Sequence, residues 1–291
     1  MIVLLGANGY LGSAFAMEML RRQWTFIPVT RRILDFSKFD TLSHFLRGAN
    51  ASFVINAAGY TGKPNVDECE TKRAETLAGN TLLPQTVAHA CAAKKIPWCH
   101  VSSGCIYDQI KSNHLYEFTE TDTPNFTFRN ERCSFYSGTK ALAEEAIAGI
   151  GESYILRLRI PFDEYDGPRN YLTKLQRYPK LYQNLNSLTH RREFVSAALD
   201  LWAKRAPFGI YNLTNPGSIT TREVVHLIKS HLDPSKLFEF WRNDEEFYRL
   251  AAIAPRSNCV LDTSKLRETG IIMRPVRDAL EASLKNWVTE L

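Results

Sequence analysis

The segment MIVLLGANGYLG, residues 1–12, decides the fold expected for this chain. Its apolar run IVLL predicts a buried strand, and Gly6, Gly9 and Gly12 follow at regular spacing where a helix begins. In such a unit the first glycine makes the tight turn, the second admits a pyrophosphate, and the third lets the helix approach the sheet. Glycines also serve plain turns, but this context favours a dinucleotide site. The residues expected there are Gly6, Asn8, Gly9, Tyr10, Leu11 and Gly12.

Strand-like runs alternate with helical stretches through the first half of the chain. Leu11, Phe15 and Met19 recur at helical spacing and predict a helix with one apolar face. This alternation predicts an α/β fold, a doubly wound parallel sheet of Rossmann type. The expected strands are IVLL, WTFIPVT, SFVINAA, PWCHVSS and SYILRLRIP, at 2–5, 24–30, 52–58, 97–103 and 153–161.

The pattern loosens after Pro161, where FDEYDGPRNYLTKLQRYPK begins. We therefore expect a dinucleotide-binding Rossmann domain over residues 1–161. Residues 162–291 are expected to form a smaller substrate-binding lobe, interleaved with the sheet and with segments that return to the Rossmann domain.

Composition limits the classes of function that fit. Of 291 residues, 44% are hydrophobic and 23% charged, and no stretch approaches the roughly 18 apolar residues of a membrane span. The net charge of +5 is spread along the chain, which favours anionic small ligands over nucleic acid. Six cysteines form neither a CxxC pair nor a cluster at metal-ligand spacing. We therefore expect free thiols and no metal site. Because no basic leader precedes the first strand, we expect a cytoplasmic protein, without membrane or nucleic-acid partners.

The end of the second expected strand indicates which dinucleotide binds. NAD enzymes usually hold the adenosine ribose with an acidic residue about 20 positions after the glycines. No Asp or Glu occurs between Arg22 and Asp35, and the strand ends in VTRR. Arg31 or Arg32 would pair with a 2′-phosphate, so NADP(H) is the expected cofactor. The alternative is an idle, solvated arginine pair.

Tyr136 and Lys140 are four residues apart in SFYSGTKALAEE, a spacing that places both on one helix face. A nearby ammonium favours the phenolate of a tyrosine, which makes the phenol a competent proton donor to a carbonyl under reduction. An exposed Tyr/Lys pair is the alternative. Ser103, at the end of an earlier strand, favours the catalytic interpretation.

With NAAG at 56–59 and the glycine segment, these residues make the chain resemble an extended short-chain dehydrogenase/reductase. The resemblance implies that Tyr136 and Lys140 also contact the cofactor, and that Ala57, Ala58 and Gly59 line its site. LDFS at 34–37 resembles the adenine-contacting segment of dTDP-4-dehydrorhamnose reductases, which implies the same role for Asp35 and Phe36.

A narrower resemblance is to the bifunctional 3,5-epimerase/4-reductases that make nucleotide-linked L-rhamnose. In that family a cysteine and a lysine are the epimerase acid/base pair, and their positions fall on Cys105 and Lys174. The resemblance also implies substrate contacts from Asn65, Asn170 and Arg256, beside Ser103, Cys105 and Lys174. The matching blocks, between residues 56 and 258, are NAAGYTGKPNVDECE, GCIYD, TDTPNFT, FYSGTK, LRLRIP, PRNYLTK, NLTNPG and APRSN.

The chemistry of these residues fits that role. Along an extended strand side chains i and i+2 share a face, so Ser103 and Cys105 are both expected to point into the crevice at the carboxyl edge of the sheet. A thiol and an amine can remove and return protons at carbons α to a ketone. The alternatives are a small buried hydrophobe for Cys105 and a solvated helix position for Lys174.

The resemblance implies NADPH-dependent epimerisation at C3 and C5 of a nucleotide-linked 4-keto-6-deoxyglucose, followed by reduction at C4 to nucleotide-L-rhamnose. UDP and dTDP both remain open as the nucleotide. A separate 4,6-dehydratase is expected to supply the ketosugar, and a homodimer stays open. Two rival functions remain: a plain 4-reductase in which Cys105 is inert, and a non-catalytic NADP-binding regulatory subunit.

Overall fold

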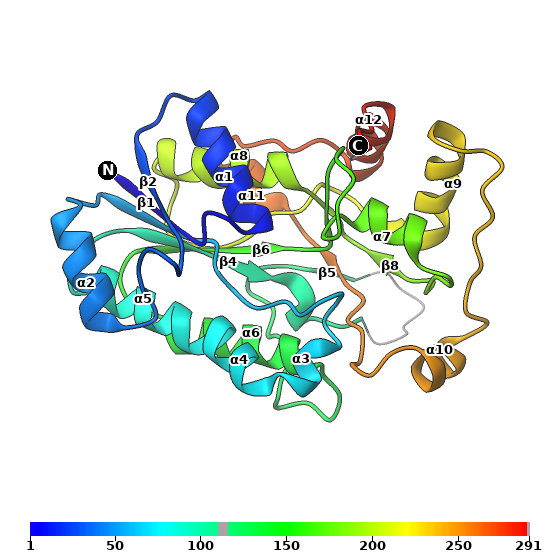
Figure 1. The fold of residues 1–291 in the computed structure, drawn as a ribbon, viewed down its shortest axis with the longest axis horizontal. Coiled ribbons are helices and arrows are strands. Elements are labelled where there is room, and N and C mark those ends of the chain that lie inside the picture. The colour runs from blue at the N-terminus through cyan, green and yellow to red at the C-terminus, as the bar shows by residue number, and fades with distance from the viewer. Residues whose placement is uncertain (110–115, 290–291) are drawn as a thin grey trace.

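The computed structural model describes residues 1–109 and 116–289 and has an α/β fold around one six-stranded parallel sheet (Figure 1). Each strand expected from the sequence is present; β1 has the predicted bounds and the other four are slightly shorter than predicted. β10 adds a sixth strand at the edge, beside β6. The strands, in spatial order, are β10 (Gly209–Asn212), β6 (Ser153–Leu158), β4 (Trp98–Ser103), β3 (Phe53–Asn56), β1 (Ile2–Leu5) and β2 (Phe26–Val29).

This strand order places a crevice at the carboxyl ends of β1 and β3. From β1 the chain passes to β2 on one side and then crosses to β3 on the other. Connections that leave neighbouring strands in opposite directions open a crevice there, and dinucleotides bind in such crevices. The prediction of a doubly wound Rossmann-type sheet is confirmed.

Two layers of helices cover the sheet because each helix buries one apolar face. In α1 the side chains of Phe15 and Met19 are fully buried, as their spacing predicts. One face is covered by α1 (Tyr10–Arg21), α8 (Arg191–Ala203) and α11 (Ser264–Glu268). The other is covered by α2 (Phe39–Gly48), α5 (Leu83–Ala92) and α6 (Phe135–Ile147). Before α5 the chain forms α3 (Glu68–Thr71), α4 (Arg73–Leu77) and a π-helical turn (Ala78–Leu82).

A smaller lobe with its own apolar cluster lies beyond the carboxyl ends of the strands (Figure 1). Its helices are α7 (Tyr171–Arg177), α9 (Thr221–His231), α10 (Asp244–Leu250) and α12 (Val276–Lys285). Short strand pairs join it to the rest: β7 (Pro161–Phe162) with β9 (Thr189–His190), β8 (Leu185–Asn186) with β11 (Ile219–Thr220), and β5 (Glu117–Phe118) with β12 (Val260–Leu261).

Segments from both halves of the chain interleave. α8 and β10 both follow residue 162, yet they pack in the helix layer and the sheet of the Rossmann part. The domain boundary near residue 162 stays a prediction. In the part of the chain that the structure describes, no helix is long and apolar enough to cross a membrane, and no three His, Cys, Asp or Glu side chains gather as a metal site.

Candidate active site

The glycine turn between β1 and α1 is packed so closely that side chains would collide with backbone. Gly6 has a φ of 77°, and a Cβ there would lie 2.8 Å from Ala58 N. A Cβ on Gly12 would lie only 2.0 Å from Gly6 O. Gly9 is the N-cap of α1 and no side chain caps this end, so the first N–H groups of the helix can face an anion. The turn therefore fits the pyrophosphate of a dinucleotide.

The other predicted residues of this turn differ in exposure. Asn8 is exposed at the tip, and Leu11 packs partly buried against the core under α1. Tyr10 is held by Arg191, whose Nε donates to the Tyr10 carbonyl at 2.7 Å and whose guanidinium lies over the ring at 4.2 Å. Arg191 belongs to α8, and the sequence did not indicate this contact.

The segment after β2 presents Arg31 and Arg32 to solvent. Both are exposed and neither forms an ion pair with another described residue, so both are available to a 2′-phosphate. Asp35 accepts a hydrogen bond from Ser37 Oγ at 2.5 Å, and the side chain of Phe36 is 1% exposed, within the core under α2. The Phe36 ring is therefore occupied by packing, and the expected contact of this segment with an adenine stays a prediction.

The end of β3 forms the wall opposite the glycine turn. Ala57 N donates to Leu5 O at 3.1 Å, and Ala58 N donates to Asn56 Oδ1 at 3.2 Å. Ala58 is the residue that a Cβ on Gly6 would strike. Gly59 follows, exposed, so Ala57, Ala58 and Gly59 lie where the strand opens into the crevice.

Ser103, Tyr136 and Lys140 meet where β4 ends against α6. All three are buried, and Lys140 Nζ donates to Val101 O at 2.9 Å. Burial lowers the pKa of Lys140 to about 8, although Glu144 and Cys105 act in the opposite direction. Burial, and then Cys105, raises the pKa of Tyr136, whereas a hydrogen bond with Ser103 lowers it. Tyr136 is thus a protonated phenol beside Ser103, with a buried cation on the same helix.

Cys105 reaches this site by a turn. The prediction of an extended strand through Cys105 is wrong, because β4 ends at Ser103 and residues Gly104–Ile106 form one 3₁₀ turn. The Ser103 hydroxyl causes the change by accepting a hydrogen bond from Cys105 N at 3.1 Å. Cys105 is half-buried and close enough to affect Tyr136 and Lys140 electrostatically.

Two buried arginines near the site were missed from the sequence. Arg159 Nη1 lies 2.7 Å from Cys105 Sγ, and Arg157 Nη2 forms an ion pair of 2.7 Å with Glu144 of α6. The same carboxylate accepts a hydrogen bond from Ser102 Oγ at 2.5 Å. LRLRIP carried a signal for both, since charged residues within an apolar strand need buried partners.

On the lobe side, three cations gather around the start of α7. Burial lowers the pKa of Lys174, and Arg169 and Arg256 lower it further. Arg256 pairs with Asp67 at 2.7 Å, and Arg169 donates to the Gly62 carbonyl at 2.6 Å. This positive cluster suits a diphosphate. No hydrogen bond joins Lys174 directly to Cys105 within the described ranges.

The two predicted asparagine contacts are engaged inside the protein. Asn65 Oδ1 accepts from Asp67 N at 2.9 Å and orders the loop after β3. Asn170 is fully buried, and its Oδ1 caps α7 by accepting from Leu172 N at 3.0 Å. Its Nδ2 donates to the Asp163 and Tyr165 carbonyls at 2.8 and 2.7 Å. Asn170 therefore positions α7, and its amide has no group left over for a ligand.

Comparison with known proteins identifies the family of this chain. The family described as the RmlD substrate binding domain matches residues 1–289. The chain belongs to the RmlD substrate binding domain family.

Relatives of this RmlD family member include a plant enzyme and two solved structures. A bifunctional dTDP-4-dehydrorhamnose 3,5-epimerase/dTDP-4-dehydrorhamnose reductase of Arabidopsis thaliana is 35% identical over 96% of this chain and 90% of its own. The L780 UDP-rhamnose synthase of Acanthamoeba polyphaga mimivirus has a TM-score of 0.88 at 22% identity over 98% of both chains. A dTDP-4-dehydrorhamnose reductase of Bacillus anthracis in complex with NADP has a TM-score of 0.81 at 19% identity, over 98% of this chain and 97% of its own.

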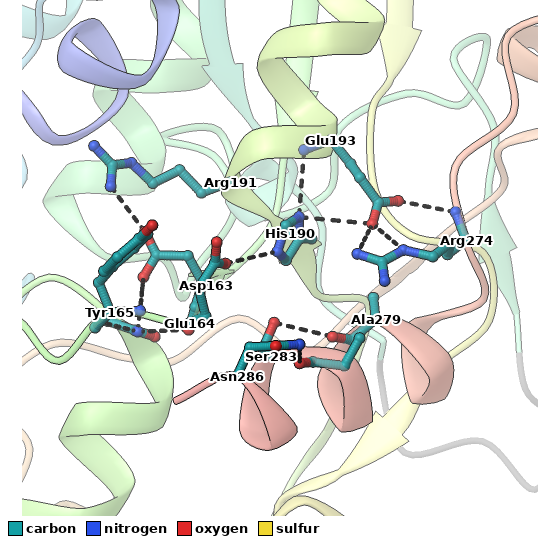
Figure 2. Close-up of polar contacts among 12 residues, drawn as sticks. Asp163, Glu164, Tyr165, His190, Arg191, Glu193, Arg274, Ala279, Ser283 and Asn286 are labelled. Atoms are coloured by element: carbon teal, nitrogen blue, oxygen red, sulfur yellow. Dashed lines mark hydrogen bonds and ion pairs between the residues drawn. The ribbon is translucent and has the colours of Figure 1, made fainter. Parts of the chain in front are cut away.

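In this member of the RmlD family a second hollow lies between α8, α12 and the loop after β7 (Figure 2). Several of its charged groups are paired inside the protein. Glu193 binds Arg274 at 2.5 Å, and His190 contacts Glu164 at 3.3 Å. The contact between Glu164 and His190 joins the loop that precedes α7 to the start of α8.

Proposed function

We propose that this chain is an NADPH-dependent 3,5-epimerase and 4-ketoreductase of nucleotide-linked 4-keto-6-deoxyglucose. One observation carries the proposal. The groups proposed for the reduction, Ser103, Tyr136 and Lys140, lie at the end of β4. The Cys105 thiol, which accepts a hydrogen bond from the buried Arg159, lies at the same strand end. Cys105 is close enough to Tyr136 and Lys140 to affect both electrostatically. A single bound ketosugar would therefore face both sets of groups.

The residues at the glycine turn fit a dinucleotide, and Arg31 and Arg32 favour the phosphorylated form. The glycine turn has no room for a Cβ at Gly6 or Gly12. It lies at the N-terminus of α1, where no side chain caps the helix. The two arginines stand where NAD enzymes usually place an acidic residue. When bound, NADPH supplies the hydride that reduces the C4 ketone.

For the reduction, Tyr136 donates its phenolic proton to the oxygen at C4. Burial keeps this phenol protonated, and Ser103 at the end of β4 is near enough to affect its pKa. Ser103 orients the ketone oxygen beside it. Lys140 places a positive charge on the same face of α6, where it favours the phenolate that the transfer leaves behind.

For the epimerisation, Cys105 and Lys174 act on hydrogens α to the ketone. Inversion requires one group to remove a proton and another to return a proton on the opposite face. Cys105 stands at the end of β4 and Lys174 on α7 of the lobe, so they approach the crevice from different elements. The cations Arg169 and Arg256 flank Lys174 and suit the diphosphate of the substrate.

The proposed chemistry begins from a ketosugar, so a 4,6-dehydratase reaction must supply the substrate. We place the protein in the cytoplasm, a reducing compartment, since all six cysteines are free.

The test supplies UDP- and dTDP-linked 4-keto-6-deoxyglucose in heavy water, first without cofactor. The parent is expected to introduce deuterium at C3 and C5, because enolate formation exchanges those hydrogens before any hydride arrives. With NADPH it is expected to form the rhamnose nucleotide, and NADPH is expected to bind more tightly than NADH. Nuclear magnetic resonance and NADPH absorbance measure both steps.

Two variants separate the steps. Tyr136→Phe is expected to bind NADPH but to reduce at least about 10²-fold more slowly. Cys105→Ser is expected to lose exchange at C3, C5 or both, while it still reduces a pre-epimerised 4-ketorhamnose nucleotide. Reduction without exchange in the parent favours the plain 4-reductase, and neither reaction with either nucleotide favours a non-catalytic NADP-binding subunit.

A further inference from the structure

Arg159 occupies an unusual position directly after β6. It is 3% exposed, and its backbone N–H donates to Thr189 Oγ1 at 2.9 Å. The next residue, Ile160, has a φ of 38°, a left-handed conformation that a β-branched side chain rarely adopts. Such strain persists only where the surrounding structure holds it in place. The fold therefore fixes the direction of the chain at Arg159.

Within the described ranges, the guanidinium of Arg159 donates to three partners, and none of them is a carboxylate. Nε and Nη2 donate to Asn186 Oδ1 at 3.1 and 2.5 Å, and Nη2 also donates to the Ser257 carbonyl. Nη1 donates to Cys105 Sγ at 2.7 Å. Of these partners only the thiol can take a negative charge.

Arg157, two residues earlier in β6, provides the contrast. It is as deeply buried as Arg159, but it forms an ion pair with Glu144 at 2.7 Å. A buried cation generally needs an anionic partner, because the interior does not solvate its charge. Arg157 has this partner permanently. Among its hydrogen-bond partners, Arg159 gains an anion only when Cys105 loses its proton, although Asp108 acts on it electrostatically without a hydrogen bond.

We propose that Arg159 is a positioning residue for the epimerisation: it holds Cys105 Sγ in place and stabilises the thiolate that acts as base. The inference rests on the proposed epimerase function and adds which residue acts as the base and which as the acid. Cys105 removes the proton, and Lys174 returns one as ammonium. Charge-assisted hydrogen bonds favour the ionised partner, and a nearby cation increases the thiolate fraction of a cysteine.

The proposed proton transfers conserve atoms and electrons. The Cys105 thiolate takes a proton from C3 or C5, so an S–H bond forms as the C–H bond breaks. The electron pair of that bond moves to the C4 ketone oxygen and gives an enolate. The Lys174 ammonium then protonates the opposite face of the same carbon. Transfer of the thiol proton to the neutral amine, through solvent, restores both groups.

Other titratable groups also face Cys105 and define the background of the test. Tyr136 and Lys140 face it from α6, and Cys259 lies beside Arg159 with its Sγ donating to Gly104 O at 3.1 Å. The Asp108 carboxylate also acts electrostatically on Arg159. All of them are left unchanged in the variants below.

Three variants test the proposal. Arg159→Gln removes the cation, and Arg159→Lys restores it. Asn186→Asp keeps Arg159 and the acceptor oxygen but adds a negative charge that competes with the thiolate. Asn184→Asp is the matched control, because Asn184 lies two residues away and contacts Thr221 instead of Arg159.

The first readout is the pH profile of iodoacetamide alkylation at Cys105, measured on its peptide by mass spectrometry with Cys105→Ser as the blank. Near neutral pH, Arg159→Gln and Asn186→Asp are expected to react at least about tenfold more slowly than the parent and to catch up in alkali. The second readout is deuterium exchange at C3 and C5, which is expected to fall in parallel. Arg159→Lys is expected to recover part of both.

The outcomes separate this inference from the proposed function. Exchange in the parent that persists unchanged in Arg159→Gln overturns the role of Arg159 and leaves the epimerase intact. No exchange in the parent overturns the epimerase and this role together. If circular dichroism shows that Arg159→Gln does not fold, Asn186→Asp decides. Slower alkylation of Cys105 near neutral pH in Asn186→Asp, with the parent rate in Asn184→Asp, supports the proposal. Alkylation of Asn186→Asp at the parent rate overturns it.

Discussion

Lys140 shows how a single buried side chain ties the site to pH. Among the described residues its ammonium has one hydrogen-bond acceptor, the Val101 carbonyl at 2.9 Å, and it lies on the same face of α6 as the carboxylate of Glu144. Burial lowers its pKa to about 8, with Glu144 and then Cys105 opposing the shift. Lys140 therefore changes charge close to physiological pH, unlike a solvated lysine.

The pH dependence of NADPH use is expected to follow Lys140. Because its pKa is lowered to about 8, the ammonium is present below that pH and is lost as the pH rises through it. kcat/KM for NADPH, which reports the free enzyme, is expected to fall above about pH 8. In Lys140→Arg the guanidinium stays charged, so the residual activity is expected to lack this fall. The same fall in Lys140→Arg would assign it to another group.

At the scale of elements, α1 depends on the absence of side chains at its first turn. The helix begins within contact of its own preceding loop, and the Gly6 carbonyl occupies the space where a Cβ of Gly12 would stand. Arg191 of α8 adds a second restraint by donating to the Tyr10 carbonyl and to Ser13 Oγ, both at 2.7 Å. The cofactor turn is thus held by α8 as well as by β1.

Gly12→Ala is expected to weaken NADPH binding and lower the free energy of unfolding by about 1–3 kcal/mol, as other overpacking substitutions do. The new Cβ would lie 2.0 Å from Gly6 O, so the loop must move. Gly48→Ala is the matched control, because no atom lies within 4 Å of its added Cβ. It is expected to be neutral or to stabilise by up to about 1 kcal/mol. Urea unfolding and fluorescence titration compare them, and equal behaviour would contradict the packing argument.

For the whole molecule, a few ion pairs join segments that are distant in sequence around the crevice. Asp67, in the loop after β3, pairs with Arg256 at 2.7 Å and also accepts from Ala254 N at 2.8 Å. Arg191 pairs with Asp163 at 2.8 Å, which links the first turn of α1 to the loop that precedes α7 (Figure 2). These contacts set the distance between the cofactor turn and the lobe.

Asp67→Asn is expected to lower the free energy of unfolding at pH 7 by about 1–3 kcal/mol. Burial acts to raise the pKa of Asp67, but Arg256 and the Ala254 N–H outweigh it and the pKa is lowered. The stabilisation is therefore present above the unfolded value of about 4 and is lost as the pH falls through the folded value.

Urea unfolding of parent and Asp67→Asn at pH 7 and at about pH 3 measures this difference. Glu268→Gln, at an exposed position of α11, is the control and is expected to change stability by less than about 0.5 kcal/mol at either pH. A gap between parent and Asp67→Asn that stays constant with pH would contradict the role of the Asp67 charge.

The sequence by itself determined the features that depend on neighbours along the chain. Apolar runs located five strands of the sheet, because a strand buried on both faces has few polar residues. The spacing of Gly6, Gly9 and Gly12 indicated the close turn, and the separation of Tyr136 and Lys140 put both on one face of α6. Each of these follows from backbone geometry over a few residues.

Only the tertiary structure decided which distant groups meet. The contact between Arg159 and Cys105 spans 54 residues, and the Ser257 carbonyl that holds Arg159 lies 98 residues away. No periodicity encodes such pairs, because they arise when β6, β8 and the segment before β12 pack around one buried charge. The 3₁₀ turn at Cys105 was hidden for a related reason. Its geometry depends on which N–H group donates to the Ser103 hydroxyl. Tertiary packing, rather than local backbone propensity, determines that this donor is Cys105 N.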